Sequence, residues 1–191
     1  LFEMPINESA VWFSYSPQYT GYKTYELQDK WSHYLDVGGK FVFSNGLILD
    51  AVYNYVLGNL QTSQVDPGGE LYYGDPHFVK HHVGLGAEYW FSHRDGLFVE
   101  ADWTDLDHTD PDLFYDYTIV SAGGGWVHQM GPNLVMDLRY RVVDFDAHDT
   151  YLSSNDFRDS TSQELTLGFS GTLNPVLGTE LRVGYLVTDY D

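Results

Sequence analysis

The sequence predicts an all-β protein, an antiparallel up-and-down transmembrane β-barrel with about eight to ten strands in this chain. Apolar and polar residues alternate with a period of two over segments of about ten residues, the length of a tilted membrane-spanning strand. Short turns alternate along the chain with longer acidic links. Aromatic residues make up 17% of the chain, and Tyr and Trp favour boundaries between apolar and wet surroundings.

The first predicted hairpin joins residues 35–43 to residues 47–57. Its turn is Ser44-Asn45-Gly46, and Asn-Gly is a strong hairpin signal because both residues tolerate positive φ. A further strand is expected before this hairpin, near residues 10–15. The sequence therefore indicates about nine strands in all.

Three more hairpins follow. The second pairs residues 83–91 with 97–104 around a turn at 93–96. The third pairs 119–128 with 134–142 around a turn at 130–133, and its outgoing strand contains Gly123-Gly124-Gly125, which leaves the faces of that strand ambiguous. The fourth pairs 164–173 with 180–188 around a turn at 174–178.

The links between hairpins are longer and acidic, at residues 58–77, 105–116 and 144–159. Short turns at one end and long polar loops at the other are typical of outer-membrane barrels. We expect one domain over residues 1–191, either a small closed barrel or a portion of a larger one. The chain begins at Leu1 without an initiator Met, so we expect a trimmed or partial product.

Composition excludes several classes of partner. The formal net charge is −19, which repels nucleic-acid phosphates and disfavours docking to anionic lipid through a basic patch. The chain has no Cys, so it has no disulfide or thiolate metal site. No phosphate loop, dinucleotide fingerprint or paired-carboxylate motif stands out. We therefore expect no cofactor, no nucleic-acid partner and no enzymatic activity.

The alternation divides the strand residues into two sets. The charged set is expected to face the lumen: Asp36, Lys40, Asp50, Glu88, Glu100, Asp102, Asp137, Arg139, Arg141, Glu164, Glu180 and Arg182. The apolar set is expected to face lipid: Leu35, Val37, Leu49, Tyr53, Leu85, Tyr89, Val99, Trp103, Met136, Leu138, Tyr140, Leu167, Phe169, Val183 and Tyr185. A soluble sheet with the apolar set inside is the alternative. The long strands and the uniform apolar face favour the membrane.

The charged set indicates what could pass a channel. Acids outnumber bases in it by about two to one, whereas a pore for anions needs a track of Arg and Lys. We expect neutral or cationic solutes, or a polymer that stacks weakly on Tyr and Trp. In a small barrel the charges would instead pair across the interior, Arg139 and Arg141 with Asp137, Glu164 and Glu180.

Two constellations weakly suggest other chemistry. Acidic residues gather in one link at Asp105, Asp107, Asp110 and Asp112, and in another at Asp144, Asp146, Asp149 and Asp156. These are weak Ca²⁺ candidates, because hard cations prefer several carboxylates. However, Thr109 stands where the calcium-loop pattern needs a ligand. A solvated acidic loop that shares divalent ions with lipopolysaccharide is the simpler interpretation.

Histidines provide the second constellation. His81 and His82 are adjacent, so in a strand they point to opposite faces and cannot easily share a metal. Ser121 with His128 would suit a lipid hydrolase only within hydrogen-bond reach, and nothing in the local sequence supports that pairing.

Segments near the last hairpins carry a family resemblance. They are Asn155-Asp156-Phe157-Arg158-Asp159-Ser160-Thr161, Glu164-Leu165-Thr166-Leu167-Gly168-Phe169-Ser170-Gly171, Leu173-Asn174-Pro175, Leu138-Arg139-Tyr140-Arg141-Val142-Val143-Asp144-Phe145-Asp146 and Val183-Gly184-Tyr185. From about Tyr34 onward the chain resembles the outer-membrane barrels known as the β-barrel porin 2 family. The resemblance rests on the hairpin cadence. Members of that family are longer than this chain, and outer-membrane barrels usually end in an aromatic residue. The resemblance implies a Gram-negative outer membrane and a link to exopolysaccharide export and exosortase systems.

Three functions follow as hypotheses. The first is a porin-like outer-membrane channel or scaffold linked to extracellular polysaccharide export. Its expected partners are outer-membrane lipid, lipopolysaccharide, polysaccharide and other subunits of an export machinery. The second is a small closed outer-membrane barrel with a structural or adhesive role through its acidic loops. The third is a soluble carbohydrate-binding β-sheet protein.

Overall fold

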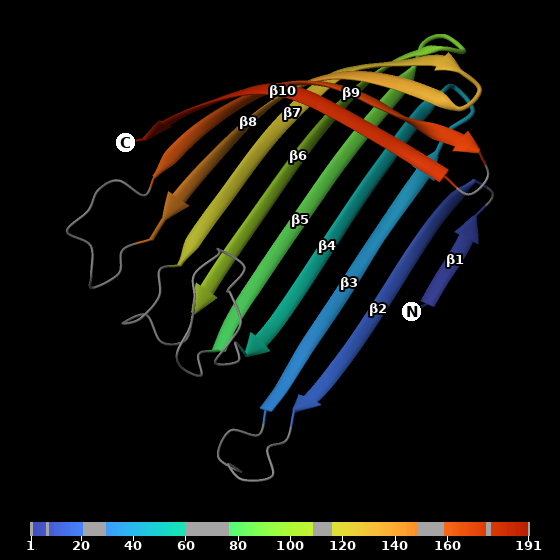
Figure 1. Cartoon of the computed structure of the whole chain (residues 1–191). Helices are drawn as coiled ribbons and strands as arrows, with labels where there is room; N and C mark the ends of the chain where they lie inside the picture. The colour runs from blue at the N-terminus through green and yellow to red at the C-terminus, as the bar shows by residue number, and fades with distance from the viewer. Residues whose placement is uncertain are drawn as a thin grey trace.

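Ten strands form one antiparallel sheet in chain order in the computed structural model (Figure 1). The structure describes residues 2–6, 8–20, 30–59, 77–108, 116–148, 159–174 and 177–190. The strands are β1 (Phe2–Ile6), β2 (Ser9–Thr20), β3 (Lys30–Val42), β4 (Leu47–Asn59), β5 (His77–Trp90), β6 (Asp95–His108), β7 (Tyr117–Gly131), β8 (Leu134–Ala147), β9 (Ser160–Asn174) and β10 (Leu177–Tyr190). The predicted all-β, antiparallel up-and-down fold of barrel type, with eight to ten strands, is confirmed.

The predicted turn chemistry is visible in the first hairpin. Gly46 has a φ of 85°, a left-handed value that glycine adopts without steric cost. The Gly46 N–H donates to the Phe43 carbonyl at 3.1 Å, and the Phe43 N–H donates to the Leu47 carbonyl at 2.8 Å. The Asn45 side chain accepts a hydrogen bond from the Leu47 N–H at 3.2 Å. This turn fixes the register in which Lys40 faces Asp50.

The strands are more numerous and longer than the sequence predicted. The expected count of about nine omitted β1, a five-residue strand that contains Pro5. β2 covers 12 residues where a strand near residues 10–15 was expected, and β10 starts at Leu177 rather than at residue 180. β4, β6 and β8 also run into the links expected at 58–77, 105–116 and 144–159. These extensions could not be predicted because acidic residues such as Asp105 interrupt the apolar alternation, although the backbone pairing continues.

The sheet is strongly curved, and β1 and β10 are its two edges (Figure 1). Within the described ranges, no pairing joins β1 to β10. We call the two ends of the sheet the short-turn end, where the hairpin turns lie, and the long-link end, where residues 60–76, 109–115 and 149–158 join successive strands. No helix in the described part of the chain is long and apolar enough to cross a membrane.

A small apolar cluster lies at the long-link end. Leu106 is 0% exposed, Tyr117 2% and Phe78 7%, and these are the buried apolar side chains among the residues that the structure describes. Val56, Ile119 and Phe145 pack against them. The rest of the described sheet has no comparable core, because its apolar side chains lie on an exposed face.

Candidate functional site

The backbone register sorts the two predicted residue sets onto opposite faces of the sheet. One row of directly paired residues runs Lys40, Asp50, Gly86, Glu100, Gly123, Arg141 and Glu164 across β3 to β9. The other charged residues lie in parallel rows on that same face. Ion pairs on this face join strands that are not neighbours, and such contacts form on the concave side, where side chains converge. The structure therefore brings the whole charged set together on the concave face.

Glycines on intermediate strands make these long-range ion pairs possible. Arg139 on β8 binds Glu100 on β6 at 3.2 Å, and β7 lies between them with Gly123 and Gly125 on the concave face. A Cβ at Gly123 would stand 3.3 Å from the Glu100 carboxylate. In the same way Arg182 on β10 binds Asp137 on β8 at 3.4 Å. A Cβ on the intervening Gly168 would stand 2.4 Å from that carboxylate.

A second network lies beside the first, nearer the long-link end. Arg141 donates to the hydroxyl of Ser121 at 2.8 Å, and Ser121 donates to Asp102 at 3.2 Å. Asp102 also lies 3.5 Å from the Arg141 guanidinium and 3.9 Å from the His82 ring. Ser121 is 2% exposed, so the network satisfies a buried hydroxyl from both sides.

These networks correct the predicted partners of the arginines. The sequence suggested that Arg139 and Arg141 pair with Asp137, Glu164 and Glu180. The structure pairs them instead with Glu100 and Asp102 on β6, because the glycine-rich β7 lets long side chains cross it. The acids Asp137 and Glu180 both bind Arg182.

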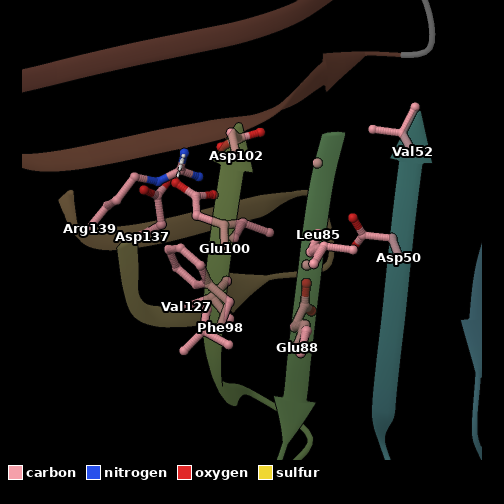
Figure 2. A pocket seen from close by; sticks show the side chains of 15 residues that line it. Asp50, Val52, Leu85, Glu88, Phe98, Glu100, Asp102, Val127, Asp137 and Arg139 are labelled. Atoms are coloured by element: carbon pink, nitrogen blue, oxygen red, sulfur yellow. Dashed lines mark hydrogen bonds and ion pairs between the residues drawn. The ribbon is translucent and has the colours of Figure 1, made fainter. Parts of the chain in front are cut away.

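A cavity of about 380 Å³ opens on the concave face between β4 and β8. Figure 2 shows Glu100, Asp137 and Arg139 meeting on one side of it, while Asp50 and Glu88 approach from β4 and β5. The Phe98 ring lies where a Cβ on Gly125 would be, and the Arg139 guanidinium stands 5.1 Å from the ring centroid. Five carboxylates and one guanidinium line the cavity: Asp50, Glu88, Glu100, Asp102, Asp137 and Arg139.

The predicted apolar set lies on the convex face. Its members include some of the most exposed large apolar side chains among the described residues: Leu85 55%, Tyr89 46%, Val99 61%, Leu138 43%, Tyr140 47%, Val183 64% and Tyr185 71%. Leu35, Val37, Tyr53, Met136 and Phe169 are half-buried on the same face. Exposure of so much contiguous apolar surface marks a surface that meets lipid or another apolar partner.

The convex apolar residues form a belt with two polar boundaries. On β6 the belt runs from Leu97 to Trp103, with Asp95 next to it toward the short-turn end and Asp105 next to it toward the long-link end. On β8 it runs from Leu134 to Val142, and Asp144 follows toward the long-link end. These segments are seven and nine residues long, which is roughly 20 to 30 Å along a strand.

Between β7 and β8 the belt shifts toward the short-turn end. The row through Trp103 is apolar from β2 to β7 and polar from β8 to β10; its members are Phe13, Val37, Tyr53, Val83, Trp103 and Val120, then Asp144, Thr161 and Asp189. The row through Met136 changes in the opposite sense at the same place; its members are Asp95 and His128, then Met136, Phe169 and Leu181. The belt therefore extends further toward the short-turn end on β8 to β10 than on β6.

Polar groups mark both boundaries. Tyr15 and Tyr53 bond to His33 and His81 at 2.7 and 2.9 Å, and the Tyr140 hydroxyl donates to Gln163 at 3.0 Å. Each partner lies one row nearer the long-link end, so the three hydroxyls point the same way. At the short-turn end Asp95 lies 2.7 Å from the His128 ring. That hydrogen bond, supported by one from Ser92, lowers the pKa of Asp95 although partial burial opposes the shift.

The weaker candidate sites do not assemble. His81 lies on the convex face against Tyr53 and Tyr55, and His82 lies on the concave face against Thr104. Ser121 and His128 lie on opposite faces of β7, so the structure does not bring them within reach of each other as a hydrolase pair.

The acidic links give no metal site among the described residues, where no group of three or more potential ligands converges. Asp105 and Asp107 extend β6 beyond the apolar belt, and burial together with the nearby Asp105 and Asp116 raises the pKa of Asp107. Asp144 and Asp146 lie on β8. The remaining candidates, Asp110, Asp112, Asp149 and Asp156, lie outside the described residues.

The fold and the site define a class, an antiparallel up-and-down β-wall of barrel type with an apolar convex belt and a charged concave face. No protein-family model matches the chain, and no curated protein matches it in sequence. Among solved structures it is similar to the Pseudomonas putida toluene transporter TodX, with a TM-score of 0.44 and 15% identity over 98% of this chain. The chain spans 66% of the length of TodX. These values assign neither a family nor a substrate to this chain.

Proposed function

We propose that this chain is the wall, or part of the wall, of a non-enzymatic outer-membrane channel. The convex belt would face lipid and the concave face would line the interior. The observation that carries the proposal is the exposed apolar belt on the convex face, whose boundary at the long-link end shifts by one register row between β7 and β8.

Strand tilt explains this shift. Strands of a membrane barrel are inclined by about 35–45° to the membrane normal. A flat membrane therefore crosses successive strands at different register positions, and both boundaries must move in the same direction. One row is roughly 7 Å along a strand. A soluble sheet that packs on a second layer has no membrane plane that would move the boundaries in one direction.

The concave face favours neutral or cationic solutes. The charged set contains eight acids and four bases. Glu100, Asp102 and Asp137 are neutralised by Arg139, Arg141 and Arg182. No ion pair of Asp50 is found among the described residues, and Asp50 projects over Gly86 toward the cavity. An anion would therefore meet net negative charge along this wall.

The biological setting is part of the same proposal. The resemblance of the last hairpins to the β-barrel porin 2 family supports a Gram-negative outer membrane and a role beside polysaccharide export. Outer-membrane lipid and lipopolysaccharide would surround the belt, and export subunits and polysaccharide would be further partners.

Planar bilayers of defined lipid test the channel. We expect discrete openings whose reversal potential in a KCl gradient indicates a preference for K⁺. Asp50→Asn should weaken that preference, because it removes the unpaired carboxylate from the cavity. Asp144→Asn is the matched control, since it removes an equal charge from the convex face. A folded, inserted protein without openings would instead be a structural or adhesive barrel, and one that stays monodisperse without detergent would be a soluble sheet.

A further inference from the structure

The concave face changes character sharply toward the long-link end. On β6, Glu100 and Asp102 keep 25% and 34% of their side-chain surface exposed. Leu106, four residues beyond Asp102 on the same face, is 0% exposed. Val56, Lys80, Leu106 and Tyr117 occupy one register row on this face, across β4 to β7.

Complete burial of these side chains has a direct consequence for a channel wall. A residue that lines a water-filled interior keeps contact with water. Leu106, Tyr117 and Phe78 have almost none, and they pack against Val56, Ile119 and Phe145 from strands β4, β7 and β8. At this level the inner side of the wall is therefore closely packed and mainly apolar, with Lys80 as the charged member of the row. Apolar constrictions stop ion flow because water and hydrated ions do not enter them.

Hydrogen bonds at the strand ends hold this cluster in place. The backbone N–H of His108 donates to the Asp116 carboxylate at 2.6 Å, which ties the end of β6 to the start of β7. The His148 N–H donates to the Asp116 carbonyl at 2.7 Å, and the Ala147 N–H donates to the Asp159 carboxylate at 2.8 Å. These bonds fasten β6, β7, β8 and β9 where the apolar side chains meet.

We propose that Phe78, Leu106 and Tyr117 form an apolar seal that controls opening of the channel at its long-link end. The proposal rests on the channel function proposed above and adds its regulation. With the cluster packed, the charged interior is closed to ions from this side. Channel openings then require the cluster to separate, so the wild-type protein spends little time open.

Single-channel recording of Leu106→Ser tests the seal. A hydroxyl in the cluster admits water, so we expect a several-fold rise in open probability with an unchanged K⁺ preference. Ile48→Ser is the matched control, because Ile48 is a half-buried apolar residue on the concave face at the opposite end. It should behave like the wild type. Equal open probabilities of wild type and Leu106→Ser would overturn the seal while leaving the channel intact. Folded, inserted proteins without openings, Leu106→Ser included, would overturn the channel itself.

Thiol labelling gives a second readout that does not depend on conduction. The chain has no Cys, so each single-cysteine variant carries one reactive site. A charged, water-soluble methanethiosulfonate should label Val52→Cys, which lines the cavity, and leave Leu106→Cys unlabelled in the same membranes. Equal labelling rates at the two positions would show that water reaches Leu106 and would overturn the seal.

Discussion

The guanidinium of Arg139 binds the carboxylate of Glu100 at 3.2 Å, although a whole strand separates the two residues. The contact exists because Gly123 and Gly125 place no side chain between them. A glycine run that weakens the local strand signal in the sequence therefore determines which charges meet on the concave face. Arg182 reaches Asp137 across Gly168 by the same arrangement.

Gly125→Val should destabilise the fold by about 1–3 kcal/mol, the usual cost of overpacking. A Cβ at Gly125 would stand 2.0 Å from the Leu138 carbonyl oxygen and 2.8 Å from the Phe98 ring. Urea unfolding in detergent micelles measures the change. Gly131→Val is the control, because nothing lies within 4 Å of its Cβ position; similar losses in both variants would contradict the steric explanation.

The Arg139 and Glu100 pair should show a coupling free energy of about 0.5–1 kcal/mol in a double-mutant cycle with Arg139→Gln and Glu100→Gln. Its side chains are 32% and 25% exposed. The Arg182 and Glu180 pair, whose acid is 64% exposed, should show a coupling near zero because water screens it. A larger coupling for the exposed pair would refute the assigned network.

Leu138→Arg should destabilise the membrane-inserted protein by about 2–4 kcal/mol and impair assembly, because it puts a charge in the middle of the belt. Arg139→Leu, one residue away on the concave face, should be tolerated far better. Heat-modifiable gel mobility after refolding into liposomes compares the folded fractions. Equal tolerance of the two substitutions would reverse the assignment of the faces.

Asp95→Asn should lower stability at neutral pH and have no effect in strong acid. Hydrogen bonding to His128 lowers the pKa of Asp95 below its ordinary value of 3.8, and Asp95 lies outside the belt. The folded state thus favours the carboxylate, whose stabilising contribution is present above about pH 4 and lost as the pH falls through the lowered pKa. Unfolding curves of the two proteins should converge once the pH lies below the lowered pKa of Asp95; a difference that stays constant from neutral pH into strong acid would exclude the linkage.

Most of the strands and hairpins could be predicted from the period-two alternation of apolar and polar residues. The first hairpin followed from Asn45 and Gly46, and the residues 134–142 alternate so clearly that Leu138 and Arg139 were assigned to opposite faces, where the structure also places them. Strand ends were predicted less well. Asp105 and Asp107 continue β6 as a paired strand, but acidic residues at apolar positions look like a loop in the sequence.

The partners on the concave face could not be predicted for a different reason. Sequence patterns relate a residue to its own strand and, through a turn, to the next one. Contacts such as Arg141 with Asp102 skip a strand, so they depend on sheet curvature and on the size of the residue between them. The one indication in the sequence was Gly123-Gly124-Gly125. Glycines inside a strand often mark a place where another group approaches the backbone closely.

Arg139 and Arg141, whose ion pairs reach across β7, also disfavour a wrong register of β8 during assembly. A slip of β8 by one residue against β7 would turn Arg139 and Arg141 to the convex side and bring Leu138 and Tyr140 inside. Two cations would then lose Glu100 and Asp102 at once and be stranded in the apolar belt. Every slip by an odd number of residues exchanges the two faces and carries this cost, so the ion pairs disfavour all such alignments of β8.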